Sequence, residues 1–493
     1  MRAFLVIVIF ALVGVFIAHS LVSLQTQSFN LWAFVAMVIS VGLLLVFPRI
    51  GFGLIIGIVL FYDPRFSFPG IHLWLHQWVI LVALVVLIGR YLHLHRSFKF
   101  HPLDGVLAVL LLTFLISYIN SPDIGLSVKW TLYYFMMVLC YFLFRLGVTD
   151  RHQLRNIIVM LILSGLINSV VSMVFSRMGA GRPGALVLSR PNALGNYLAL
   201  ILPLGMALLF FSPFSRKLKA WCGAAVLIIS ISLILTLSRS SWLGVIVGLL
   251  ALGFFKPRPI YFLIIFLCLG GVLLLPEVKQ RVVDDREDSG VYYRRAKNDM
   301  AYLMFKEYPI VGRGPGSFQA LAVHSDFWGI KAHSGLENLY LRLLAEGGLL
   351  QALAFIIFYI YLTHLGLTTA RSLPPGLRQA AVLGALAGCW AVLGCGLGDD
   401  PFINPMINWV VGIYLGIIVS ISQSTIPGSE EPGSYHPQPF SPQDGQSGYN
   451  REAVAEGDII EHQDSRKIED QHQEKPGFFP EPGGYGRADA GQE

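Results

Sequence analysis

A succession of apolar runs, each near the length that crosses a lipid bilayer, dominates this sequence of 493 residues. Hydrophobic residues make up 55% of the chain and charged residues 13%, more apolar surface than a water-soluble domain can bury. By the criterion of about twenty apolar residues per span, we expect an all-α polytopic membrane protein with about 12–14 transmembrane helices. The runs lie at residues 3–24, 31–47, 50–62, 76–93, 104–119, 128–148, 154–176, 192–212, 219–236, 241–255, 259–276, 338–365, 377–396 and 403–421.

Lysine and arginine are distributed unevenly between the connections, which indicates the orientation of the chain. If the N-terminus is inside, every inside connection contains Lys or Arg, as residues 216–219 do. The outside connections near residues 25–30, 120–127 and 397–402 contain none. Basic residues concentrate on the cytoplasmic side of membrane proteins. We therefore predict cytoplasmic N- and C-termini and an external position for residues 277–336.

The segment 277–336 is the longest polar interruption between apolar runs, and loops of this length are usually functional or disordered. Its aromatic residues and glycine-rich turn favour a folded, functional loop. Beyond it, residues 423–493 are rich in Pro, Gly, Gln, Ser and Glu, a composition typical of disorder. We accordingly divide the chain into N-terminal helices (1–190), a core with the external loop (191–422) and a disordered acidic cytoplasmic tail.

Several arginines fall on the predicted external side, where the positive-inside rule does not place them. Arg239 lies in a tight turn between two apolar runs, and Arg182 and Arg190 precede another run. An arginine at membrane depth is costly unless it faces a polar cavity, a partner or a ligand. Guanidinium binds phosphate with two parallel hydrogen bonds, so the cluster favours an anionic ligand such as a lipid-linked diphosphate. The alternative is that these side chains extend to the membrane interface without binding a ligand.

His333 and Glu337 are the candidate proton acceptors, because they share one helix face at the mouth of the run 338–365. Either side chain could take a proton from a sugar hydroxyl. The alternatives are N-terminal capping by Glu337 and simple solvation of His333. Asp399 and Asp400 form a further external acidic pair without an assigned role.

The glycine-rich turn at residues 312–317 (GRGPGS) resembles a phosphate-binding loop only superficially. No Lys-Ser or Lys-Thr follows it, and Pro315 lacks the backbone donor that such a loop needs. We predict instead a tight turn that sets the loop helix against the helix bundle.

An ordered set of segments resembles the O-antigen ligase and O-antigen polymerase family of bacterial membrane glycosyltransferases. No single segment is specific, but their order and the long external loop between them match the family over about residues 190–365. The segments are 191–195 (PNALG), 236–244 (TLSRSSWLG), the stretch around Arg295, 309–318 (PIVGRGPGSF) and 337–349 (ENLYLRLLAEGGL).

The resemblance implies a multi-pass enzyme of the bacterial inner (cytoplasmic) membrane with a periplasmic active site. It implies a donor glycan on undecaprenyl diphosphate, a glycan or lipid A core acceptor, and inversion without a metal or other cofactor. On this chain Arg239, Arg182, Arg190 and Arg295 would bind the diphosphate. Glu337 or His333 would activate the acceptor. A chain-length regulator or other envelope proteins are further candidate partners, and no nucleic acid is expected.

One departure from the family bears on the reaction. The ligase pattern that these segments resemble has His immediately before the Asn of the last segment. This chain has Glu337 at that position and His333 four residues earlier. The sequence therefore favours an exopolysaccharide or O-antigen polymerase over a ligase. The alternative from another class is a small-anion transporter or channel of the same fold, because external arginines also suit an anion entry site.

Overall fold

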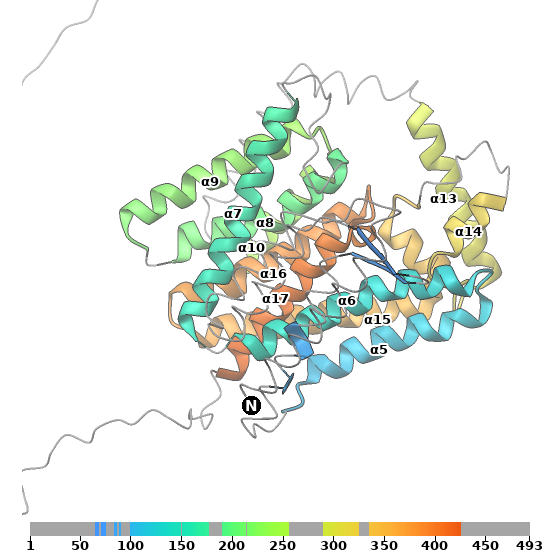
Figure 1. The fold of residues 1–493 in the computed structure, drawn as a ribbon, viewed down its shortest axis with the longest axis horizontal. Coiled ribbons are helices and arrows are strands. Elements are labelled where there is room, and N and C mark those ends of the chain that lie inside the picture. Colours follow the sequence, from blue (N-terminus) through green and yellow to red (C-terminus); the bar gives the residue numbers. More distant parts are fainter. Residues whose placement is uncertain are drawn as a thin grey trace, which may run out of the picture. The chain divides into compact units, whose positions relative to one another are not determined.

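The fold is a bundle of membrane-length helices with a small helical element at one end (Figure 1). Among the residues that the computed structural model describes, eight helices are long and apolar enough to cross a membrane, and α10 is a shorter apolar helix. The predicted all-α polytopic class is confirmed. The described residues are 65–68, 71–74, 83–85, 88–89, 99–148, 150–176, 190–212, 214–255, 289–324 and 335–424.

The helices follow the predicted apolar runs wherever the structure describes them. The predicted spans 3–24, 31–47, 50–62 and 259–276 lie outside the described residues, as does most of 76–93. The helices are α5 (Pro102–Ile116), η1 (Ser117–Asn120), α6 (Ile124–Gly147), α7 (Arg151–Phe175), α8 (Pro191–Phe211), α9 (Arg216–Leu235), α10 (Arg239–Phe255), α13 (Ser289–Glu307), α14 (Ser317–His324), α15 (Leu339–Ser372), α16 (Leu377–Gly396), η5 (Pro401–Ile403) and α17 (Pro405–Ser424).

A short antiparallel hairpin is the exception to the helical pattern in the described part of the chain. Strand β1 (Arg65–Phe68) pairs with β2 (Ile71–Trp74), and Phe68 stands opposite Ile71 at the turn. The hairpin falls in a segment that the sequence assigns to a connection between two spans. It therefore leaves the predicted fold class unchanged.

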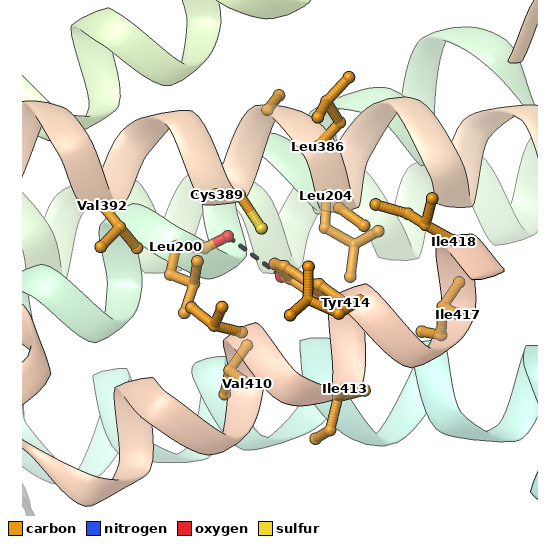
Figure 2. Close-up of a cluster of buried hydrophobic side chains, with 14 of the residues drawn as sticks. Leu200, Leu204, Leu386, Cys389, Val392, Val410, Ile413, Tyr414, Ile417 and Ile418 are labelled. Carbon is orange, nitrogen blue, oxygen red and sulfur yellow. Dashed lines mark hydrogen bonds between the residues drawn. The ribbon is translucent and has the colours of Figure 1, made fainter. Parts of the chain in front are cut away.

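The centre of the bundle is formed by α8, α16 and α17, which are buried over most of their length. In Figure 2, aliphatic side chains from these three helices interleave around Tyr414. The Tyr414 hydroxyl donates to the Leu200 carbonyl at 3.1 Å, so the polar end of this side chain is satisfied inside apolar packing. This rigid centre carries the loops at its two ends.

Helix α10 packs against α16 through glycines. A Cβ on Gly244 would lie 2.2 Å from Sγ of Cys395 and 2.8 Å from the Ala391 carbonyl oxygen. A Cβ on Gly394 of α16 would lie 2.8 Å from Cα of Gly244. Small residues allow membrane helices to approach closely, since lipid provides no hydrophobic force between them. The glycine of the segment TLSRSSWLG is thus explained by helix packing.

Helix α15 is broken at Gly348, whose φ of 65° and ψ of −168° are not helical. In a continuous helix Leu349 and Leu350 would donate to the carbonyls four residues earlier. The break frees these two N–H groups and two carbonyls, and the loop segment 309–314 pairs with all four of them. The hydrogen bonds run from Leu349 N to Pro309 O (2.8 Å), Leu350 N to Ile310 O (3.0 Å), Arg313 N to Ala345 O (3.1 Å) and Gly314 N to Glu346 O (2.8 Å).

The glycine-rich turn is therefore a docking turn, as the sequence predicts. Gly312, Gly314 and Gly316 have φ values of 76°, 94° and 77°, in the left-handed region that side chains disfavour. A Cβ on Gly312 would lie 2.5 Å from the backbone of Glu346. Asn120, between α5 and α6, donates its side-chain amide to the Gly312 carbonyl at 3.0 Å. The turn is held between α15 and the connection that follows α5.

The described part of the segment 277–336 has a small core of its own, which confirms that this part is folded. Side chains of α13 and α14 pack with residues that flank the start of α15, and both helices lie at one end of the bundle (Figure 1). The buried members are Ala296, Met300, Ala301, Met304, Phe318, Ala322, Leu336 and Ala345.

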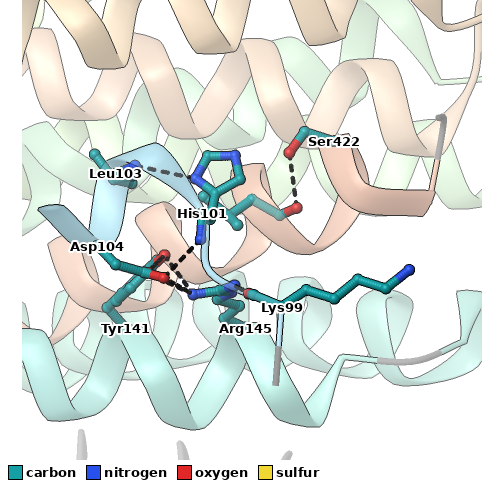
Figure 3. A network of polar contacts seen from close by, with 8 residues as sticks. Lys99, His101, Leu103, Asp104, Tyr141, Arg145 and Ser422 are labelled. Atoms are coloured by element: carbon teal, nitrogen blue, oxygen red, sulfur yellow. Dashed lines mark hydrogen bonds and ion pairs between the residues drawn. The ribbon is translucent and has the colours of Figure 1, made fainter. Parts of the chain in front are cut away.

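The other end of α5 and α6 is closed by a buried ion pair (Figure 3). Arg145 donates to Asp104 at 2.5 and 2.6 Å, and the Tyr141 hydroxyl donates to the same carboxylate at 2.6 Å. The backbone N–H of His101 supplies a further hydrogen bond at 2.8 Å. A buried charge is tolerated when it is paired and its remaining lone pairs are satisfied, as here.

Substitution of Gly244 by leucine tests the close packing of α10 on α16. We expect Gly244→Leu to destabilise the protein by about 1–3 kcal/mol, because the added side chain has no space between the helices. The measurement is the thermal unfolding midpoint of the detergent-solubilised chain. Gly223→Leu in α9 is the matched control, since a Cβ there would meet only Leu209, at 3.9 Å. Equal midpoints for the two variants would contradict the packing.

Candidate functional site

A small polar cavity lies where the starts of α8 and α10, the end of α16 and helix α13 meet. Its volume is about 70 Å³, and two arginines, Arg239 and Arg294, contribute to its wall. Two guanidinium groups at one cavity produce a positive potential that suits an anion. The full lining is Asn192, Leu237, Ser238, Arg239, Ser240, Arg294 and Gly398.

Arg239 is placed by a tight reversal between α9 and α10. The hydroxyl of Thr236 donates back to the Leu233 carbonyl at 2.7 Å and accepts from the N–H of Ser238 at 3.3 Å. Leu237 takes a φ of 51°, which is rare for a residue with a branched side chain. Helix α10 can therefore begin at Arg239 itself. Strained backbone of this kind is typical of functional sites.

Helix α8 approaches this turn closely because Gly195 has no side chain. A Cβ on Gly195 would lie 2.4 Å from Oγ of Ser241 and 3.1 Å from Oγ1 of Thr236. The next residue, Asn196, then reaches the turn and accepts a hydrogen bond from Ser241 at 2.8 Å. The segments PNALG and TLSRSSWLG are thus two sides of one contact.

Arg294 reaches the cavity from α13 and is held by Glu337. Its Nε donates to Oε2 of Glu337 at 2.7 Å, and Nζ of Lys297 lies 3.1 Å from Oε1 of the same carboxylate. Burial alone would raise the pKa of Glu337, but the charges of Lys297 and Arg294 outweigh burial and lower this pKa. Glu337 is therefore ionised at neutral pH and bridges two cations.

Asp399 lies on the far side of the cavity, next to Gly398. Its Oδ2 accepts from the side-chain amide of Asn196 at 2.8 Å, and its Oδ1 accepts from the N–H of Asp400 at 2.8 Å. Burial raises the pKa of Asp399, and the negative charge of Glu337 acts in the same direction. Glu337 and Asp399 thus act electrostatically on each other across the site.

A second buried pair fixes the turn that carries Asp399. Arg342, near the start of α15, forms an ion pair with Asp400 and a hydrogen bond with the hydroxyl of Tyr134. The Arg342 guanidinium also lies over the ring of Trp130, 5.5 Å from its centre. This cation–π contact and ion pair tie α6, α15 and η5 together at the end of the bundle that carries the cavity.

Residues 224–356 match a protein-family model described as O-Antigen ligase. We call this stretch the O-antigen ligase domain, because it is similar to that family. This match confirms the resemblance that the sequence segments suggested. It supports a membrane protein that processes glycans. A search among curated proteins finds no match to this chain.

The O-antigen ligase domain contains Arg239, Arg294 and Glu337, whereas Asn196 and Asp399 lie outside the matched residues. The cavity is thus completed by α8 and by the turn after α16. Both flanking elements must be present for the lining to form.

The structure brings only some of the sequence-predicted residues together. Arg239 lines the cavity, and Glu337 contacts the second arginine of that cavity. Arg190 is exposed at the start of α8, and Arg295 is exposed on α13. Arg182 and His333 lie outside the described residues.

The N-terminal cap of α15 is Asn338, whose side chain accepts from the N–H groups of Tyr340 and Leu341 at 3.0 and 3.1 Å. The alternative assignment of Glu337 as the capping residue is wrong. Its carboxylate bonds to Arg294 and Lys297 instead.

Sequence reasoning missed Arg294 and Lys297 as site residues and selected the neighbouring Arg295. The helical period of α13 contains the signal. Ala301 is fully buried, and Arg294 and Lys297 lie seven and four residues before it, on the same face. Arg295 is rotated by about 100° from Arg294 in an ideal helix and faces solvent.

Removing Lys297 tests the electrostatic link to Glu337. We expect Lys297→Gln to raise the pKa of Glu337, because the opposing effect of burial remains while a stabilising cation is lost. Infrared titration measures this pKa as the carboxyl band that disappears when Glu337→Gln is added to the same variant. Lys306→Gln, on the exposed face of α13, is the matched control. An unchanged Glu337 titration in Lys297→Gln would contradict the link.

Proposed function

We propose that this protein is a membrane glycosyltransferase that polymerises or ligates glycan carried on undecaprenyl diphosphate at the periplasmic face. Polymerisation of an exopolysaccharide or O-antigen is favoured over ligation, because Glu337 stands where ligases have histidine. The observation that carries the proposal is the pair Arg239 and Arg294 at one cavity of the O-antigen ligase domain.

The diphosphate of the donor is the group that this cavity would bind. Among the described residues, Arg294 forms hydrogen bonds only with Glu337 and only through Nε, so its two terminal nitrogens remain available. Guanidinium groups match phosphate oxygens in a forked geometry. They also stabilise the charge that develops on a departing diphosphate in the transition state. The two arginines would therefore both hold the donor and assist its leaving group.

The transfer requires an acceptor hydroxyl to lose its proton as it attacks the anomeric carbon. A new glycosidic C–O bond forms, the C–O bond to the diphosphate breaks, and undecaprenyl diphosphate leaves with its electron pair. Single displacement inverts the anomeric centre. Glu337 is ionised and lies beside Arg294, so it is placed to receive the proton. His333 is the second candidate for this role.

Arg294 links donor binding to the basicity of Glu337. The free carboxylate is a weak base, because Lys297 and Arg294 lower its pKa. A diphosphate on Arg294 would offset the positive charge that Glu337 senses and raise that pKa. Glu337 would then become a better proton acceptor only when the donor is present, which disfavours wasteful proton transfer in the empty site.

The proposed periplasmic location of the cavity is supported by the distribution of basic residues between the two ends of the helices. The basic starts of α7 and α9 lie opposite the end that carries the cavity, since the helices alternate in direction. Basic residues favour the cytoplasmic side. On this basis we propose an inner-membrane protein with cytoplasmic termini and an external cavity. A chain-length regulator and a lipid A core or glycan acceptor remain proposed partners.

The transporter alternative is less well supported by the described core. Transport of an anion needs polar groups along the path through the bilayer. The packing of α8, α16 and α17 around Tyr414 is apolar and close (Figure 2). The two arginines lie at one end only of this packed centre.

Alanine substitutions at the two arginines test the proposed donor site. We expect Arg239→Ala and Arg294→Ala each to lower polymer formation by about 100-fold or more, because each removes a donor to the leaving diphosphate. Polymer formation by Arg239→Lys should lie between that of the unsubstituted protein and that of Arg239→Ala, because lysine keeps the charge but cannot form two parallel hydrogen bonds to phosphate. Polysaccharide length on gels and membrane abundance by immunoblot provide the measurement.

The matched control is Lys306→Ala, which removes an exposed cation from the same helix as Arg294. We also expect Arg295→Ala to reduce polymer less than Arg294→Ala. If polymer falls more in Arg295→Ala than in Arg294→Ala, the diphosphate-binding role belongs to Arg295. Normal polymer length in Arg239→Ala would overturn the proposed function.

A further inference from the structure

A chain of side-chain hydrogen bonds connects the Arg239 turn to Asp399, and the proposed reaction assigns no role to it. Asn196, in the middle, donates to Asp399 and accepts from Ser241, both at 2.8 Å. Ser241 lies 2.8 Å from the hydroxyl of Ser238, which lies 3.2 Å from that of Ser240. Ser238 and Ser240 flank Arg239 and line the cavity.

Asp399 fixes the direction of the two hydrogen bonds that the Asn196 side chain makes. The Oδ2 atom of Asp399 accepts from the amide nitrogen of Asn196, as a carboxylate oxygen does. The amide oxygen of Asn196 then faces Ser241, whose hydroxyl proton must be donated to it. The Ser241 hydroxyl is also within hydrogen-bond distance of Ser238, which in turn contacts Ser240. One carboxylate thus sets the orientation of the Asn196 amide and of the Ser241 hydroxyl that donates to it.

This chain holds a backbone conformation that the sequence does not favour by itself. The turn contains Leu237 at a φ of 51°, which is costly for this residue type. Directed hydrogen bonds on the following residues offset that cost. They leave Arg239 pointing from the first position of α10 towards the cavity that it lines.

We propose that Asn196 and Asp399 are positioning residues that lock the Arg239 turn in its diphosphate-binding conformation. They act through Ser241 and Ser238, not on the substrate. The inference rests on the proposed function, because the ligand of Arg239 is the diphosphate of that proposal. It adds α8 and the turn after α16 to the binding machinery, although both lie outside the matched domain.

The test exchanges the two side chains and uses farnesyl diphosphate as the probe, with the full chain purified in lipid nanodiscs. Asn196→Asp places two carboxylates together and removes the donor to Asp399, so affinity should fall about tenfold or more. In the double variant Asn196→Asp/Asp399→Asn, the new amide donates to the new carboxylate, which still accepts from Ser241. Affinity should return to within about threefold of the unsubstituted protein.

Asp399→Asn alone separates positioning from proton transfer. The new amide can present either its oxygen or its nitrogen to Asn196, so affinity should fall by about threefold to tenfold, and turnover should fall by no more than affinity does. If Asp399 were itself the proton acceptor, turnover would be lost in this variant and in the exchange variant while affinity stayed normal, which would overturn the proposal.

Two further variants exclude a purely electrostatic effect of the added charge. Asn338→Asp adds a negative charge near Glu337 and keeps the helix cap, so affinity should change by less than about threefold. Ser241→Ala removes the link to Asn196 without changing charge, and affinity should fall by about threefold to tenfold. Ser241→Ala also keeps the test decisive if Asn196→Asp does not fold.

The outcomes distinguish this inference from the function on which it rests. Absence of farnesyl diphosphate binding by the unsubstituted protein would overturn both. Normal binding by the unsubstituted protein and by Ser241→Ala would overturn the positioning role alone. If the exchange variant binds farnesyl diphosphate as weakly as Asn196→Asp does, the positioning role alone would also be overturned.

Discussion

The site depends on a backbone exchange at the break in α15. Gly348 interrupts the helix, and the four groups that lose their helical partners bond to the loop segment 309–314. Unpaired backbone groups near lipid cost several kcal/mol, so this helix is stable only with the loop docked. Because α13 leads directly into the docked segment, the exchange also fixes the position of Arg294. A loop that could otherwise move freely is thereby made part of the membrane scaffold.

The two arginines of the cavity come from structurally different parts of the chain. Arg239 begins the apolar helix α10, whose glycines lie against α16, so its position is set by the core of the bundle. Arg294 belongs to the loop and is positioned by Glu337 and by the small core around Ala301. A diphosphate bound by both would join the loop to the bundle. The binding energy of the proposed donor would thus add to the stability of the docked loop.

The sequence predicted the features that depend on local pattern and left open those that depend on distant contacts. Apolar runs predicted the described helices. The missing Lys and the proline of GRGPGS argued against a phosphate-binding loop, and its turn residues predicted a tight turn that sets the loop against the bundle. Arg239 was identified because an arginine at membrane depth is costly. Arg294 was missed because choosing it over Arg295 requires the rotation of α13 about its axis, which the core around Ala301 determines. The contact between Asn196 and Asp399, 203 positions apart, has no local signal at all.

The acidic groups around the cavity have distinct environments, and this separates their roles. Glu337 is paired with two cations and keeps a lowered pKa, whereas burial raises the pKa of Asp399. If both carboxylates simply neutralised the arginines, an anionic ligand would have little reason to bind. Instead Asp399 is engaged by Asn196, and Arg294 gives Glu337 only its Nε. The terminal nitrogens of Arg294 therefore keep their capacity for a ligand, and the cavity stays cationic despite the neighbouring carboxylates.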